Sequence, residues 1–328
     1  MVKTKNGQSM LQRKLVALLK RLSPKHEKYR QVESDLGKKR SGDYGESSID
    51  YYLAQINGNP KYQTIKDVRL SLNNYHFQID TLLLFPSFFI ILETKHLTGT
   101  LLFDPDYHQL IQIKKEVESN EISRQDPILQ VKMQYNQLKR WLLHYEVEGY
   151  PGYCFVVLTN QNAIVKVLSN PDLVQEYVYK NPALPFKIES IIANHQPNHS
   201  SSHSSQDIFS LISRNLVPKN EDILEDYNIN PTEIITGVEC PQCNRIAMER
   251  LPRRWMCLYC KHSSNDAHIQ TLIDHSLLIS PCITIREMCR FLYIDNVRSA
   301  RKIIKELGLE KRGASVKTEY SLKNLFVT

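Results

Sequence analysis

Three ionisable residues stand inside a strongly apolar stretch, Phe77–Lys95. They are Asp80, Glu93 and Lys95, and they belong to two apolar runs that Pro86-Ser87 separates. Runs of this kind, on either side of a turn signal, predict a β-hairpin with buried strands. Because charged side chains rarely occupy buried strands unless they are paired or bind a metal ion, the three residues are candidates for a functional site.

The turn position predicts how these residues face one another. A hairpin that turns at Pro86-Ser87 places Asp80 directly opposite Glu93, whereas a three-residue loop would break this pairing. Lys95 follows Glu93 by two residues, so the strand period puts it on the same face. Two opposed carboxylates repel each other, and a divalent metal ion would relieve the repulsion. A buried structural ion pair is the alternative interpretation.

Four of the seven cysteines form two Cys-x-x-Cys pairs, Cys240/Cys243 and Cys257/Cys260, which are separated by thirteen residues. Each pair can clamp one side of a tetrahedral zinc ion, and the residues between them would form a hairpin that closes the site. Since protein would fill all four positions, this Zn²⁺ is expected to be structural. A redox-active Cys-x-x-Cys pair is the alternative.

The cysteine-rich segment is also basic and aromatic. Arg253 and Arg254 precede Trp255, and Tyr259 lies between the last two cysteines. Basic residues could bind nucleic acid here, and the two aromatic rings could stack on bases or pack the small core.

The C-terminal residues predict a compact helical module. Helices are expected over 268–278, 284–292 and 297–307, and the residues around Gly313 could form a wing after them. This order resembles a winged helix-turn-helix, although a generic helical cap explains the pattern equally well. The side chains that would line the exposed face of the last helix are Arg298, Arg301, Lys302 and Lys305.

Positive charge is concentrated at the two ends of the chain. The net charge is +7, yet residues 1–40 carry twelve Lys and Arg residues against three acidic ones, and residues 281–328 carry ten against five. Basic ends on a nearly neutral middle indicate a polyanionic partner, of which nucleic acid is the first candidate. A solvated arm is the alternative interpretation of the N-terminal segment.

No apolar run approaches the roughly 20 residues that a membrane-spanning helix needs. The apolar patch Leu15–Leu19 is short and flanked by Lys and Arg, which does not fit a secretory signal. We therefore expect a cytoplasmic protein without a membrane partner.

Several short motifs resemble the nuclease-related domain (NERD) family. They are Tyr44-Gly45-Glu46 opening a helix, Gln78-Ile79-Asp80, Glu93-Thr94-Lys95 with Thr98-Gly99, and Asp126-Pro127-Ile128-Leu129-Gln130. They occur in the family's order over roughly residues 41–160, and the family is similar to the PD-(D/E)xK nuclease superfamily. His96 and Leu97 stand where the family often has Asn-Trp, a departure that leaves the metal-binding set intact.

The resemblance implies a fold and a site. The fold would be α/β, a restriction-endonuclease-like mixed sheet flanked by helices, followed by the zinc ribbon and the winged-helix-like module. Asp80 and Glu93 would hold Mg²⁺ or Mn²⁺, and Lys95 would orient the attacking water or stabilise developing charge. Glu46 would add a carboxylate to the metal shell or bind its waters, and Gln130 would hydrogen-bond the water or the backbone.

These features predict five segments. They are a basic helical arm over 1–40, a nuclease domain over 41–217 with its core at 41–160, a linker over 218–236, the zinc ribbon over 237–263 and the helix-turn-helix-like module over 264–328. The leading hypothesis is a nuclease that uses Mg²⁺ or Mn²⁺ to hydrolyse nucleic acid, with DNA as the substrate. The alternative is a non-catalytic nucleic-acid-binding or regulatory protein with a preserved nuclease-like fold.

Overall fold

The computed structural model describes residues 9–57, 62–114, 121–195, 203–219, 222–313 and 318–326. The chain forms two compact units, of which unit 1 comprises residues 41–219 and unit 2 combines residues 2–40 with 220–328. The predicted domain boundaries separate residues 1–40 from the ribbon, whereas the structure groups these segments. No helix in the described residues is long and apolar enough to cross a membrane, and the cytoplasmic location stays a prediction.

A five-stranded mixed sheet forms the centre of unit 1, in the strand order β1-β2-β3-β7-β9. The pairs β1/β2 and β2/β3 are antiparallel, whereas β7 is parallel to both β3 and β9. The expected mixed sheet flanked by helices is confirmed. Its strands are β1 (Gln63–Leu72), β2 (Tyr75–Leu84), β3 (Phe89–Lys95), β7 (Gly152–Leu158) and β9 (Val178–Lys180).

Two tight turns determine the register of the first three strands. Asn73 and Asn74 both have positive φ, as a two-residue type I′ turn between β1 and β2 requires, and asparagine tolerates that conformation. At the next turn the Phe85 N–H donates to the Phe88 carbonyl at 2.9 Å across Pro86-Ser87. The turn is therefore centred on Pro86-Ser87, as the sequence predicts.

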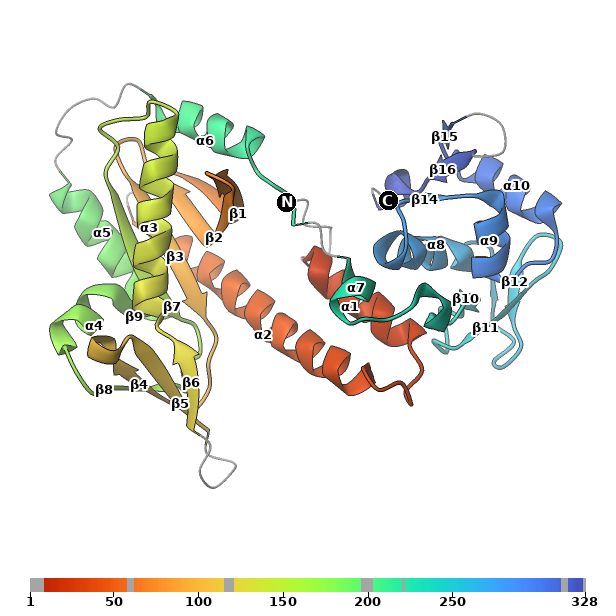
Figure 1. Ribbon diagram of the computed structural model, residues 1–328, viewed down its shortest axis with the longest axis horizontal. Coiled ribbons are helices and arrows are strands. Elements are labelled where there is room, and N and C mark those ends of the chain that lie inside the picture. Colours follow the sequence, from red (N-terminus) through yellow and green to blue (C-terminus); the bar gives the residue numbers. More distant parts are fainter. Residues whose placement is uncertain are drawn as a thin grey trace. The chain divides into compact units, whose positions relative to one another are not determined.

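Helices cover both faces of the sheet. On one face Leu82 and Ile91 pack with α3 (Pro127–His144) and α6 (Ser205–Arg214). On the other face Leu83 and Ile90 pack with α5 (Leu184–Asn194) and with the end of α2 (Tyr29–Leu53). Figure 1 shows α3 lying across β3 and β7. Strand alternation therefore assigns successive side chains of Leu82–Leu84 and of Phe89–Leu92 to opposite helical layers.

The remaining strands of unit 1 form a second sheet, in the order β6-β5-β4-β8. Together with the remaining short helices they are β4 (Thr100–Asp104), η1 (Pro105–Tyr107), β5 (Gln109–Ile113), β6 (Glu121–Gln125), β8 (Ile164–Val167), α4 (Pro171–Tyr177) and η2 (Asn181–Ala183).

Helix boundaries follow the predicted caps in one case and not in another. α3 begins at Pro127, and the Asp126 carboxylate accepts from the Ile128 N–H at 2.8 Å, as expected. The helix expected from Ser41 instead begins at Tyr29. It continues through Gly37 and Gly42, which cost about 1 kcal/mol each in a helix interior, because tertiary packing outweighs that cost.

Unit 2 contains a cysteine-rich sheet and a helical part with a small sheet. The cysteine-rich sheet has the order β10-β11-β12-β13, and the small sheet has the order β14-β16-β15. The elements are α1 (Met10–Arg21), α7 (Ile223–Asp226), η3 (Pro231–Glu233), β10 (Val238–Glu239), β11 (Ile246–Arg250), β12 (Trp255–Cys257), β13 (Ser263–Ser264), α8 (Ala267–Leu278), β14 (Cys282–Ile283), α9 (Ile285–Leu292), α10 (Val297–Glu306), β15 (Lys311–Arg312), β16 (Glu319–Ser321) and η5 (Lys323–Phe326).

A buried arginine ties the N-terminal helix α1 to the rest of unit 2. Arg21 donates through Nε to the Asp274 carboxylate at 2.8 Å, and both side chains are at most 2% exposed. Its Nη1 donates to the carbonyls of Ile235 and Gly237, and its guanidinium lies 4.8 Å from the centre of the Phe291 ring. At least one basic residue of the N-terminal segment, Arg21, thus forms internal contacts and is not available to a partner.

We predict that Arg21→Ala destabilises unit 2 by about 3–5 kcal/mol, because it leaves the Asp274 carboxylate buried without its partner. Hydrogen exchange followed by mass spectrometry would measure this separately in the two units. Peptides of unit 2 should exchange faster and peptides of unit 1 should not change. The exposed Lys25→Ala is the control, and equal exchange in the two variants would contradict the prediction.

Candidate functional site

The hairpin β2–β3 brings the predicted acidic residues together. The two strands pair from Leu84 opposite Phe89 to Thr81 opposite Leu92, and Asp80 and Glu93 are the next residues beyond the last pair. The Asp80 carboxylate reaches across the strands and accepts from the Thr94 N–H at 2.9 Å. The two acidic side chains therefore lie close enough for the charge of Glu93 to act on Asp80.

Glu93 is the most constrained residue of this group. Its side chain is buried, and its Oε1 accepts from Lys95 Nζ and from Gln130 Nε2, each at 2.7 Å. Lys95 Nζ also donates to Gln130 Oε1 at 3.0 Å. The Gln130 amide therefore fixes both charged groups, a more specific contact than the sequence predicts for it.

Gln134 is a site residue that the sequence analysis missed. Its Nε2 donates to Glu93 Oε2 at 2.7 Å, and the side chain is buried. Gln130 and Gln134 lie four residues apart on α3, so both amides point at the same carboxylate. That spacing after the Asp126-Pro127 cap is the signal that could have identified it.

Asp80 sits in an electrostatically unfavourable place. Burial and, after it, the negative charges of Glu93 and Glu46 raise the pKa of its carboxyl group, whereas the Thr94 N–H and Lys95 lower it, and together they bring this pKa to about 8. A carboxylate that resists ionisation beside other carboxylates is in a site that favours a cation.

A glycine allows α2 to bring Glu46 near the hairpin. A Cβ atom on Gly45 would lie 2.8 Å from both the His96 Cβ and the Thr159 Oγ1, so only glycine permits this approach. His96 Nδ1 and Thr159 Oγ1 are themselves 2.9 Å apart. Gly45 thus permits close packing of α2, and Glu46 places its carboxylate near enough to act on Asp80.

The donor set of unit 1 fits a hard divalent cation. Carboxylate oxygens are the ligands that Mg²⁺ and Mn²⁺ prefer, and the charges of Glu93 and Glu46 remain felt at Asp80 despite Lys95. Within the described residues, however, no three of these carboxylates come within 4.8 Å of one another. A metal ion bound by Asp80 and Glu93 would therefore complete its shell largely with water.

We predict that Asp80→Asn stabilises metal-free unit 1, because the amide keeps an acceptor for the Thr94 N–H and removes the repulsion. The raised pKa means that wild-type stability falls as the pH rises from about 4 towards 8, where the folded carboxyl ionises. The gain should be on the order of 1–3 kcal/mol at pH 8 and smaller at pH 5.

Chemical denaturation of the zinc-loaded chain at the two pH values, in buffer without Mg²⁺ or Mn²⁺, measures this gain. The conservative variant Asp106→Asn, on the surface of the same unit, is the control because its side chain is exposed. A destabilised Asp80→Asn variant, or the same gain in the control, would show that Asp80 is not held under repulsion.

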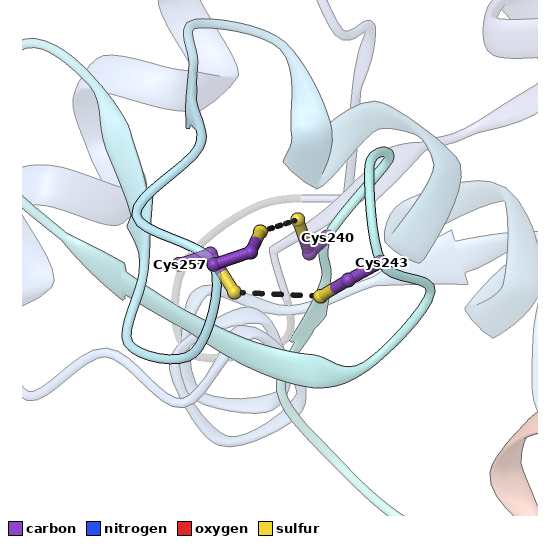
Figure 2. A group of neighbouring side chains, drawn as sticks. Cys240, Cys243 and Cys257 are labelled. Carbon is purple, nitrogen blue, oxygen red and sulfur yellow. Dashed lines mark hydrogen bonds between the residues drawn. The ribbon is translucent and has the colours of Figure 1, made fainter.

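The four predicted cysteines converge in unit 2. Their sulfur atoms all lie within 4.8 Å of one another, with Cys240 Sγ 3.6 Å from Cys260 Sγ and Cys243 Sγ 3.7 Å from Cys257 Sγ. Figure 2 shows Cys240, Cys243 and Cys257 directing their sulfurs to one point. Tetrahedral Zn–S bonds of about 2.3 Å would place sulfurs roughly 3.8 Å apart, so the cluster is compatible with a zinc ribbon.

The predicted nucleic-acid-binding residues are all at the surface of unit 2. Arg253 and Arg254 lie in the turn between β11 and β12 and are exposed. The other four project from α10, whose apolar side packs through Ala300 and Ile303. The exposed residues of α10 are Arg298, Arg301, Lys302 and Lys305, of which Lys302 also lies 3.6 Å from the Glu306 carboxylate.

The two aromatic residues of the ribbon have different environments. Trp255 is fully buried and donates from Nε1 to His268 Nδ1 at 3.0 Å, so it packs the core and cannot stack on a base. Tyr259 is 69% exposed, and the Arg245 guanidinium lies 3.6 Å from its ring centre. Of the two alternatives, packing holds for Trp255, whereas Tyr259 remains accessible.

Comparison with known proteins identifies the family of this site. Residues 41–159 match the nuclease-related domain (NERD) family. No curated protein and no solved structure matches the chain. The matched segment contains Glu46, Asp80, Glu93, Lys95 and Gln130, and it ends well before the cysteine cluster.

Proposed function

We propose that the nuclease-related domain of this chain hydrolyses phosphodiester bonds of nucleic acid, with DNA as the substrate, and that it requires Mg²⁺ or Mn²⁺. The observation that carries the proposal is the carboxylate pair on one sheet face. Asp80 and Glu93 directly follow the last pair of β2 and β3, the charge of Glu93 acts on Asp80, and Lys95 donates to Glu93 at 2.7 Å. The family match supports the same reaction class.

Each residue of the site has a role in this proposal. Asp80 and Glu93 would hold the metal ion, and Glu46 would bind its waters from α2. Lys95 would place positive charge beside the phosphate oxygens, where negative charge grows as water attacks phosphorus and the bond to the leaving oxygen breaks. Gln130 and Gln134 would keep Glu93 and Lys95 in position.

A bound divalent ion would lower the pKa of a coordinated water and neutralise phosphate charge. The protein's own contribution is preorganisation, because the Glu93 carboxylate is already oriented by three hydrogen bonds. Fixed ligands of this kind need little rearrangement when a substrate binds.

The direct test is cleavage of linear, circular and single-stranded DNA by the purified chain with Mg²⁺ or Mn²⁺. We expect Asp80→Asn and Glu93→Gln to reduce the rate by roughly 10²-fold or more, because each removes a charged metal ligand. His108→Ala, an exposed change in the same unit, should retain activity. Metal-independent cleavage, or equal cleavage by all variants, would refute the proposal.

We further infer that the four cysteines hold a structural Zn²⁺. All four positions are filled by protein, and Cys240 and Cys257 are buried. We predict that Cys240→Ser reduces zinc content from one ion per chain and loosens unit 2, whereas Cys282→Ser, a cysteine outside the cluster, does neither. Elemental analysis checks this, and unchanged zinc in Cys240→Ser would contradict it.

A second candidate function is nucleic-acid binding without cleavage, which the helical part of unit 2 favours. Its elements follow the order α8, β14, α9, α10, β15 and β16, with β14 paired to β16. We infer that this is a winged-helix-like module in which α10 contacts DNA. Such binding would survive Glu93→Gln and would yield no metal-dependent product.

We predict that Arg298→Ala and Arg301→Ala together weaken binding to duplex DNA and reduce the salt dependence, since each phosphate contact contributes about one unit to the slope of log K against log salt. Fluorescence anisotropy over a range of NaCl concentrations measures both quantities. The exposed Lys323→Ala of the same unit is the control. An unchanged slope in the double variant would exclude α10 as the binding face.

A further inference from the structure

A second site of unit 1 lies at the opposite end of β7 from the acidic residues. A cavity of 380 Å³ is formed there by α3, α4, α5 and the first residues of β7. Gly152, at its wall, pairs with Phe89, whereas Glu93 pairs with Val156. Four residues of strand, about 13 Å, thus separate Gly152 from the level of Glu93, and the lining continues along β7 as far as Phe155.

At the cavity wall, the edge of β7 that faces away from β3 has no neighbouring strand. The Phe89 N–H donates to the Pro151 carbonyl at 3.0 Å, so alternation along a parallel pair turns the N–H and C=O groups of Gly152 and Cys154 away from β3. β9 begins to pair with β7 only at Val156. In the described part of the chain, no hydrogen bond from outside the sheet reaches the backbone of Gly152 or Cys154.

The unpaired backbone N–H and C=O groups of Gly152 and Cys154 could form hydrogen bonds with a ligand. Cys154 is buried, and buried backbone donors and acceptors almost always have partners. An N–H and a C=O on one strand edge present a donor next to an acceptor, the pattern that the edge of a nucleobase also presents. A planar ligand in the cavity would satisfy both.

The cavity also holds two cations against aromatic rings. Lys132 Nζ lies 5.0 Å from the centre of the Tyr177 ring, and Lys187 Nζ lies 5.5 Å from that of Phe155. Glu176 is the acidic residue of the lining, and neither lysine forms an ion pair with it among the described residues. Both ammonium groups are therefore available to an anion while the rings hold them in place.

We propose that this cavity binds a nucleotide. The base would lie among the tyrosine rings with its edge on the backbone of Gly152 and Cys154, and the phosphate would lie between Lys132 and Lys187. Glu176 would accept hydrogen bonds from ribose hydroxyls. The volume falls within the roughly 300–1,000 Å³ typical of small-molecule sites, so it suits one nucleotide and not a duplex.

The ligand could be a free mononucleotide or the terminal nucleotide of a single strand, because both offer the same base and phosphate. The proposal does not depend on catalysis by Asp80 and Glu93. Its failure would leave the cleavage test untouched, and a failed cleavage test would leave this site untouched.

The experiment is a calorimetric titration of the zinc-loaded full chain, in buffer without Mg²⁺ or Mn²⁺, with AMP, with inorganic phosphate and with a single-stranded octanucleotide. AMP should bind, and the double variant Lys132→Ala/Lys187→Ala should weaken it at least tenfold. Lys139→Ala, on α3 but outside the lining, should not. If the octanucleotide competes with AMP, the ligand is the terminal nucleotide of a single strand. If it does not compete, the ligand is a free mononucleotide.

Hydrogen exchange of the wild-type chain gives a second readout that needs no variant. Saturating AMP should slow exchange in peptides that contain residues 152–155, because the Cys154 N–H gains an acceptor. The proposal is overturned if AMP does not bind at millimolar concentration, if phosphate binds as tightly as AMP, or if AMP binds without protecting these residues.

Discussion

The repulsion between Asp80 and Glu93 is the constraint on which unit 1 depends. Two carboxylates at opposed positions of a buried hairpin would separate unless other groups held them. The two-residue turn at Pro86-Ser87 fixes their register, and the Gln130 and Gln134 amides hold Glu93 from α3. The site is thus assembled by the fold before any cation binds, at a cost that raises the pKa of Asp80.

The sequence predicts the parts of this arrangement that local rules govern. The hairpin register follows from the turn and the strand period, and the start of α3 follows from the Asp126-Pro127 cap. The cysteine cluster follows from pair spacing. Gln134 was not predicted because its spacing of four from Gln130 identifies a shared helix face but not the Glu93 carboxylate, which lies 41 residues away in the chain.

Long-range contacts explain what the sequence could not show. The N-terminal helix joins unit 2 through Arg21 and Asp274, which are 253 residues apart, so no local pattern links them. A basic segment that resembles a free arm is instead partly structural. The acidic residues around Asp80 lie in unit 1, whereas the exposed basic residues of α10 and of the ribbon turn lie in unit 2.

The central claim is that the opposed carboxylates bind one divalent metal ion, and calorimetric titration of the zinc-loaded chain with Mn²⁺ tests it most directly. The wild type should bind one Mn²⁺ in unit 1, and Glu93→Gln, which keeps the shape of the side chain but loses its charge, should lose that site. Equal Mn²⁺ binding by the two proteins, or none by the wild type at millimolar Mn²⁺, would contradict the account.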